Sequence, residues 1–120
     1  MASSYEDLVA WQKAMKLVTE IYHASENFPK HEAFGLTTQL RRAAVSVPSN
    51  IAEGQGRLTR KDFRHFLATA RGSLQEMQTQ LRIAENLHFL GHEQTQELLA
   101  SSAELGRILN GLMASIKEVG

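Results

Sequence analysis

The sequence has no cysteine, only two prolines and few aromatic residues among its 120 positions. The absence of cysteine excludes disulfide bonds and thiolate metal sites, and it fits a cytoplasmic protein. No apolar run approaches the roughly 20 residues that a membrane-spanning helix needs, so we expect no membrane association. Residues Met1–Asp7 lack the basic start and the apolar stretch of a secretory signal peptide. We therefore expect a cytoplasmic location.

The sequence also lacks net charge, because its 13 basic residues balance its 13 acidic residues. Hydrophobic residues make up 42% of the chain, which is too many for a disordered protein. A chain of this length is the usual size of a single domain, and we expect one domain over residues 1–120. Strand-like alternation is nearly absent, and good helix formers such as Ala, Leu, Glu, Gln and Arg dominate. These features predict an all-α protein.

Apolar residues recur at steps of three and four, which is the period of an amphipathic helix. The third helix is the clearest, because Thr59 is a good N-cap, with Asp62 three residues later, and Gly91 supplies a stop. Its apolar line is Phe63, Leu67, Ala70, Leu74, Met77, Leu81, Ala84 and His88. The expected helices cover about residues 5–25, 32–52, 60–88 and 93–118. Short connections favour antiparallel neighbours, so we predict an up-down-up-down four-helix bundle.

Two of these helices have unusual features. The first carries two neighbouring apolar lines, and only one of them needs to face the bundle interior; they are Leu8, Trp11, Met15, Val18 and Tyr22, and Ala14, Leu17 and Ile21. The second contains Pro48, which removes a backbone donor and clashes with the preceding turn. We therefore predict a kink or short break in the second helix, and a self-association surface on the first.

Motifs for catalysis and cofactor binding are missing. The sequence has no nucleophile elbow and no Walker loop, and the glycines at Gly54 and Gly56 follow a helix, where a dinucleotide fold would need a strand. His88 and His92 are four residues apart, but Gly91 is expected to end the helix between them. We expect no catalytic residues, no cofactor and no metal site.

Polar residues at helical spacing occupy the segment around Pro48; they are Ser46, Ser49, Asn50 and Glu53. One interpretation is a solvated helix face. The other is a polar cluster that satisfies the backbone groups that Pro48 leaves without partners.

Zero net charge conceals a strong asymmetry along the chain. Residues 41–71 contain seven basic and two acidic residues, a net charge of +5, whereas the remainder carries six basic and eleven acidic residues, a net charge of −5. Arg60, Arg64, Arg71 and Arg82 fall within roughly 40° of one another on a helical wheel. Two interpretations stay open: arginine stems that cover the edge of the core, or a phosphate-binding stripe. The candidate nucleic-acid-binding residues are Arg41, Arg42, Arg57, Arg60, Lys61, Arg64, Arg71 and Arg82.

Several motifs resemble those of one family over nearly the whole chain. The most specific is the segment Ser46–Gly54, which reads Ser-Val-Pro-Ser-Asn-Ile-Ala-Glu-Gly. Further matching features are Leu8, Trp11 and Ala14; Phe28-Pro29; the run from Glu32 to Ala43; the run from Phe66 to Glu76; and the final helix. Together these motifs resemble the 23S ribosomal RNA intervening-sequence proteins. That family's relatives include the accessory variability determinant of diversity-generating retroelements, which is typically strongly basic, unlike this neutral chain.

The resemblance implies a four-helix bundle without catalytic residues, and a homo-oligomer, with a pentamer favoured. It also implies association with nucleic acid or with a protein partner. Two hypotheses follow for this chain. The first is an oligomeric nucleic-acid-binding or ribonucleoprotein accessory protein. The second is a structural or protein-interaction module that binds no nucleic acid.

Overall fold

Helices make up the architecture of this protein. The computed structural model describes residues 4–116, and within that range no strand is present. The four long helices are α1 (Val9–Ser25), α2 (Leu36–Gln55), α3 (Arg60–Asn86) and α4 (His92–Ser115), with short 3-10 turns at Tyr5–Asp7 and Lys30–Glu32. The predicted all-α bundle is therefore confirmed. No helix within the described range is long and apolar enough to cross a membrane.

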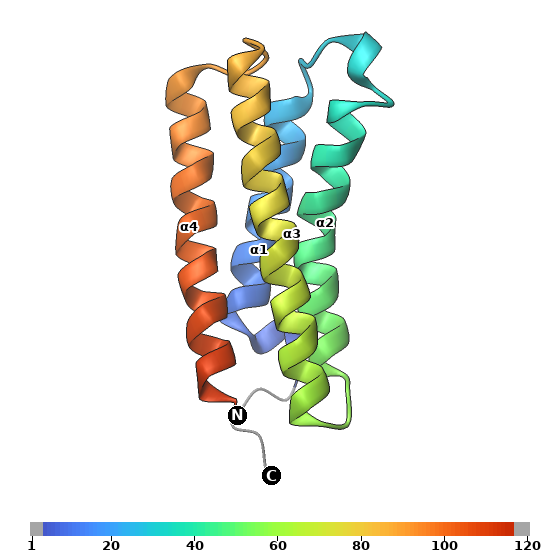
Figure 1. Cartoon of the computed structure of the whole chain (residues 1–120), viewed down its shortest axis with the longest axis vertical. Coiled ribbons are helices and arrows are strands. Elements are labelled where there is room, and N and C mark those ends of the chain that lie inside the picture. Colours follow the sequence, from blue (N-terminus) through green and yellow to red (C-terminus); the bar gives the residue numbers. More distant parts are fainter. Residues whose placement is uncertain (1–3, 117–120) are drawn as a thin grey trace.

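The helices form a square bundle in which successive helices run in opposite directions (Figure 1). Each helix packs on its neighbours in the chain, and α1 also packs on α4, whereas the diagonal pairs make no close backbone contact. Side-chain contacts give the register. Ser46 of α2 meets Ser73 of α3, and Arg71 of α3 meets Asn110 of α4. The α2–α3 turn consequently lies at the same end of the bundle as the end of α4.

The core consists of one apolar line from each helix. In α1 the buried line contains Ala14, Leu17 and Ile21, and the parallel line through Trp11 and Met15 lies at the surface. In α2 both Ala43 and Ala44 are buried. Leu74 and Leu81 of α3 are 1% and 0% exposed, as the sequence predicts for the centre of the seam. In α4 the buried line is Leu98, Ser102, Leu105, Leu109 and Met113.

The helix ends differ in places from the sequence-based expectation. Thr59 caps α3 as predicted, since its hydroxyl accepts a hydrogen bond from the amide of Asp62 at 3.1 Å. The prediction that Gly91 stops this helix is wrong, because α3 ends at Asn86 and Gly91 is the N-cap of α4. His88 lies outside the helix with a φ of 63° and is exposed, so it does not belong to the seam. The fourth helix ends at Ser115, earlier than the predicted residue 118, because Ile116 is extended; residues 117 and 118 lie outside the described range.

α2 runs without a break through Pro48, which is buried. A kink at this position stays a prediction. Helix α2 also continues past Glu53 to Gln55, where the sequence suggested an earlier stop. The expected stop does not occur at Gly54, because this glycine lies within the helix, is buried against α3 and does not form a turn.

Candidate nucleic-acid interface

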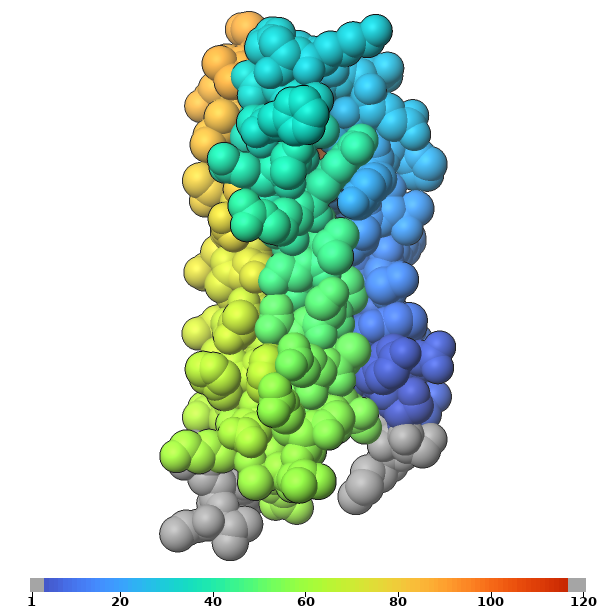
Figure 2. Space-filling view, turned by 90° about the vertical axis from the view of Figure 1, so that its right-hand side faces the viewer, coloured from blue at the N-terminus to red at the C-terminus, as the bar shows by residue number. Residues whose placement is uncertain are grey.

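Most of the candidate basic residues gather at one end of the bundle, around the α2–α3 turn and the first three turns of α3. The group consists of Arg57, Arg60, Lys61, Arg64 and Arg71. The turn forms the lower end of the bundle in the side view of Figure 2. The sequence shows that these residues are close together along the chain. The structure adds that α3 presents Lys61, Arg64 and Arg71 to one surface hollow, whose other wall is α4.

This hollow is an open groove of about 600 Å³ between α3 and α4, which we call the α3–α4 groove. Its lining is Lys61, Arg64, His65, Ala68 and Arg71 from α3, with Asn110, Met113 and Ala114 from α4. Among residues 4–116, no carboxylate lines it, although the whole chain carries equal numbers of acidic and basic residues. A groove with only cationic and neutral walls attracts anions.

Two of the arginines in the groove are held by contacts with α4. The Nη1 atom of Arg71 donates a hydrogen bond to Oδ1 of Asn110 at 2.9 Å. The Nε atom of Arg64 donates to the backbone oxygen of Met113 at 3.4 Å. A guanidinium has five N–H donors, so the bond to Asn110 orients Arg71 and leaves further Arg71 donors for a ligand. The sequence did not reveal the contribution of α4, because Asn110 lies 39 residues after Arg71 and Met113 lies 49 residues after Arg64.

Arg57 is held by a different pair of partners beside the groove. Its Nη2 atom lies 3.0 Å from Oε1 of Glu53, one helical turn earlier. Its guanidinium carbon lies 4.7 Å from the centre of the Phe66 ring on α3. Glu53 therefore forms an ion pair with Arg57 and is not part of the polar cluster around Pro48.

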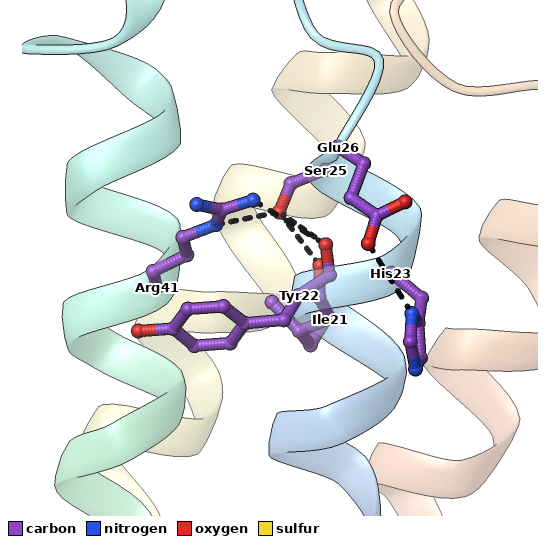
Figure 3. A network of polar contacts seen from close by, with 6 residues as sticks. All are labelled: Ile21, Tyr22, His23, Ser25, Glu26 and Arg41. Atoms are coloured by element: carbon purple, nitrogen blue, oxygen red, sulfur yellow. Dashed lines mark hydrogen bonds and ion pairs between the residues drawn. The ribbon is translucent and has the colours of Figure 1, made fainter.

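Arg41 has a structural role at the opposite end of α2 (Figure 3). Its Nε atom donates to Oγ of the buried Ser25 at 2.9 Å, and Nη2 donates to the backbone oxygen of Tyr22 at 3.3 Å. The guanidinium carbon also lies 4.5 Å from the centre of the Tyr22 ring. Because a cation near the last carbonyls of a helix is favourable, Arg41 fastens the end of α1 to the beginning of α2.

Arg42 and Arg82 also lie away from the groove. Arg42 borders a small hollow between α2 and α3 that also contains the carboxylate of Glu76. Arg82 is eleven residues beyond Arg71, which corresponds to roughly 16 Å along α3. The structure thus separates the eight sequence-derived candidates into the cluster at the α2–α3 turn and three arginines elsewhere.

The polar residues around Pro48 divide in a similar way. Asn50 donates through Nδ2 to the backbone oxygen of Ser46 at 2.8 Å and to its hydroxyl at 2.9 Å. The Ser46 hydroxyl in turn lies 2.9 Å from that of Ser73, so this part of the cluster joins α2 to α3. Ser49 is exposed and donates to the backbone oxygen of Val45 at 2.8 Å. Sequence reasoning missed Ser73, because its role depends on helix register.

Close packing of α2 against α3 is the structural reason for Gly54, the glycine at the end of this motif. A Cβ atom at this position would lie 2.7 Å from Cβ of Phe66 and 3.1 Å from Cδ1 of Phe63. These distances are shorter than van der Waals contact, and a Cβ carbon has no freedom to move away. Only glycine therefore allows α2 and α3 to approach this closely beside the turn.

The two histidines near the α3–α4 connection do not form a metal site. His92 lies at the start of α4, with Nδ1 2.6 Å from Oε2 of Glu85, and His88 lies nearby in the α3–α4 connection. Over residues 4–116, no group of three or more histidine, aspartate or glutamate side chains is arranged to hold a metal ion.

A second surface, the α1–α2 face, is apolar. It is a shallow groove lined by Tyr5, Trp11, Met15, Val18, Val45, Pro48, Ser49 and Ala52. Within the described range, no charged side chain lines it, and Met15 and Val45 are 42% and 40% exposed. In Figure 2, this groove follows the vertical boundary between α1 (blue) and α2 (green). The α1 side of this face is the second apolar line of α1, in which Trp11 and Val18 pack partly against the core and Met15 is exposed.

The comparison with known families agrees with these motifs and with the fold. The model of the 23S rRNA-intervening sequence protein family matches residues 6–111. The chain belongs to this family. Among solved structures, it is similar to a protein with unknown function from the S23 ribosomal protein family of Bacteroides thetaiotaomicron. The two chains share 20% sequence identity, with a TM-score of 0.82 over 89% of this chain and 96% of the other. No curated protein matches the sequence.

The matched range of residues includes Pro48 and Gly54. At 20% identity, the likeness to the Bacteroides protein shows the fold alone. Neither comparison assigns a ligand to the α3–α4 groove or to the α1–α2 face.

Proposed function

We propose that this intervening-sequence protein is a non-catalytic, oligomeric bundle that binds RNA or DNA through the α3–α4 groove. The observation that carries the proposal is the lining of this groove. Lys61, Arg64 and Arg71 line it, and no carboxylate from the described part of the chain shares it, in a protein of zero net charge. Such a separation of charge favours a polyanionic ligand.

The groove favours contacts with phosphates over contacts with base edges. Arginine and lysine bind phosphate through charge-assisted hydrogen bonds, and the bonds to Asn110 and Met113 orient two of the arginines before a ligand arrives. Among residues 4–116, no phenylalanine, tyrosine or tryptophan lines the groove, and His65 is the one imidazole there. We therefore expect little sequence preference inside it. Each phosphate contact releases counterions, so the logarithm of affinity for a single strand should fall by about 0.7 per contact per decade of salt.

A charge-matched pair of double variants tests this proposal. Lys61→Glu/Arg71→Glu reverses two groove charges, whereas Lys16→Glu/Arg82→Glu makes the same chemical change at exposed positions outside the groove. Both variants have the same net charge, so general repulsion of a polyanion is equal. Fluorescence anisotropy with a labelled single strand at about 50 mM salt should show a much larger loss for the groove variant. The Arg60→Glu/Arg64→Glu variant should behave like the groove variant.

Two outcomes would contradict the proposal. If the wild-type protein binds neither RNA nor DNA at this salt concentration, the protein-interaction hypothesis is favoured. If both double variants bind equally well, the basic residues serve only as a solvated edge of the core. Circular dichroism and light scattering of each variant establish that fold and oligomeric state are unchanged.

The oligomeric part of the proposal is supported by the α1–α2 face. An uncharged groove that contains Trp11 is suited to bury apolar surface against a second copy of the chain. The family resemblance favours five copies, and in a ring each subunit would use two different surfaces. The basic grooves would then repeat around the axis, and their fields would add.

Charged substitutions test this interface without disturbing the core. Met15→Glu/Val45→Glu places carboxylates in the α1–α2 face, and Ile83→Glu/Leu87→Glu places them at positions that are similarly exposed, at 42% and 50%. Light scattering should give a multiple of 13.4 kDa for the wild type and the second variant, and a smaller mass for the first. A monomeric wild-type protein at micromolar concentration would exclude self-association.

A further inference from the structure

The tip of the α2–α3 turn carries an apolar side chain that the fold does not use. Leu58 is 101% exposed, so its side chain has no packing role in the bundle. Single exposed apolar residues are common on protein surfaces. The surroundings of Leu58 are less ordinary, because Arg57 precedes it and Arg60 and Lys61 follow it closely. An apolar tip flanked by cations is suited to a ligand that is both anionic and apolar.

Arg57 offers a flat surface next to this tip. One face of its guanidinium lies over the Phe66 ring at 4.7 Å, and the contact with Glu53 at 3.0 Å fixes its direction. The side chain is 45% exposed, so the second face of the guanidinium is open to solvent. Unstacked nucleic-acid bases stack on arginine planes as well as on aromatic rings.

The turn is continuous with the α3–α4 groove. Lys61 lies in the first turn of α3 and also lines the groove, three residues after Leu58. The start of α3 contributes a positive helix end near the tip, which favours phosphate. A strand whose phosphates follow the groove would therefore place a neighbouring base at the turn.

We propose that the α2–α3 turn is a base-contact site for single-stranded RNA or DNA. One unstacked base packs on Leu58 and on the open face of the Arg57 guanidinium, while Lys61 and the groove bind the adjacent phosphates. This inference rests on the proposed function and adds a preference for single strands, because a duplex keeps its bases stacked inside. The contact requires no particular base edge, so it tolerates any sequence.

Substitution of Leu58 tests the site, since a fully exposed side chain can be changed without affecting the core. Leu58→Ser removes the apolar contact, and Leu58→Trp enlarges it. The matched control is Phe34→Ser, which replaces a 99% exposed apolar residue before α2, at the other end of the bundle. The probes are a labelled oligodeoxyadenylate, an abasic strand of the same length, and a duplex, at about 50 mM salt.

Leu58→Ser should weaken binding of the oligodeoxyadenylate about fivefold, in line with the loss of one stacking contact. Leu58→Trp should strengthen it, and Phe34→Ser should leave it unchanged. Binding of the abasic strand should be equal for all these proteins. The wild type should also prefer the oligodeoxyadenylate to the duplex.

Equal binding of the oligodeoxyadenylate by the wild type and Leu58→Ser would overturn the inference and leave the groove proposal standing. Failure of the wild type to bind any strand would instead refute the proposed function. Anionic lipid vesicles provide a further control. Binding to such vesicles that depends on Leu58, without an effect on the oligodeoxyadenylate, would assign the tip to a membrane surface and overturn the inference.

Discussion

The α1–α2 face and the α3–α4 groove are each formed by two adjacent antiparallel helices, yet their surface chemistry is opposite. The first is lined by apolar and uncharged side chains, whereas the second combines three cations with His65, an amide and small or apolar side chains. Arginines occur near both, but their environments differ. Arg41 is bonded to Ser25 and Tyr22 within the fold, whereas Arg71 is bonded to one side chain at the rim of the groove. Basic residues of the same positively charged segment therefore differ in whether they line the groove.

The core that both faces share should show the largest response to mutation. Leu81→Ala, at a site with 0% exposure, should lower the free energy of unfolding by about 2–5 kcal/mol. Leu74→Ala should have a similar effect. Leu87→Ala, at a site that is half exposed, should cost less than about 0.5 kcal/mol. Urea denaturation measures these values, and a small cost at Leu81 would place it on the surface.

Glycine substitutions should separate the tightly packed α2–α3 contact from the open surface of α3. Gly54→Ala should destabilise the protein by about 1–3 kcal/mol, because its Cβ would clash with Phe63 and Phe66. Gly72→Ala is the control, since no atom lies within 4 Å of a Cβ there. It should stabilise α3 by up to about 1 kcal/mol. Thermal denaturation should therefore give shifts of opposite sign, and two equal shifts would contradict the packing role of Gly54.

Of two arginine substitutions, Arg41→Ala should mainly lower stability, whereas Arg71→Ala should mainly lower nucleic-acid affinity. Arg41→Ala removes hydrogen bonds at the end of α1 and should lower the free energy of unfolding by about 1–2 kcal/mol. Arg71→Ala removes one exposed contact and should cost less than about 0.5 kcal/mol. Nucleic-acid affinity should fall for Arg71→Ala and stay unchanged for Arg41→Ala. If Arg41 affects binding more than Arg71 does, the distinction between the two regions fails.

The smallest effect is expected at the contact between α1 and α4, away from both surfaces. Lys13 lies 2.8 Å from Glu104, and its hydrogen bond and charge lower the pKa of that carboxyl group below its ordinary value. A lowered pKa in the folded state contributes stability above the ordinary pKa, and this contribution is lost as pH falls through the lowered pKa. Lys13→Ala should raise the pKa of Glu104 in an NMR titration. An unchanged pKa would show that the pair does not persist in solution.

Much of the fold follows from local sequence signals. The period of the apolar residues predicted the helices, the cap at Thr59 set the start of α3, and the seam through Leu74 and Leu81 identified buried residues. The predicted helix ends were wrong where one residue could mark either of two helices. Gly91 suggested a helix stop, but the chain leaves α3 earlier and adopts a positive φ at His88. A glycine marks a change of direction without showing which of two helices it belongs to.

The candidate site was only partly predictable, because its cations were visible in the sequence and their grouping was not. The charge asymmetry over residues 41–71 identified Lys61, Arg64 and Arg71. It gave no sign that Arg41 is bonded within the fold or that Asn110 forms the opposite wall of the groove. Side chains from different helices meet according to helix register, which no local pattern encodes.

The sequence by itself determined the helical periods, the position of Pro48 and the concentration of positive charge in one quarter of the chain, since these depend on neighbouring residues only. The tertiary structure decided which of the two apolar lines of α1 is buried. It also decided that Gly54 permits close contact between α2 and α3, and which cations face the α3–α4 groove. The physical reason is that burial and charge grouping depend on how four helices rotate and align against one another.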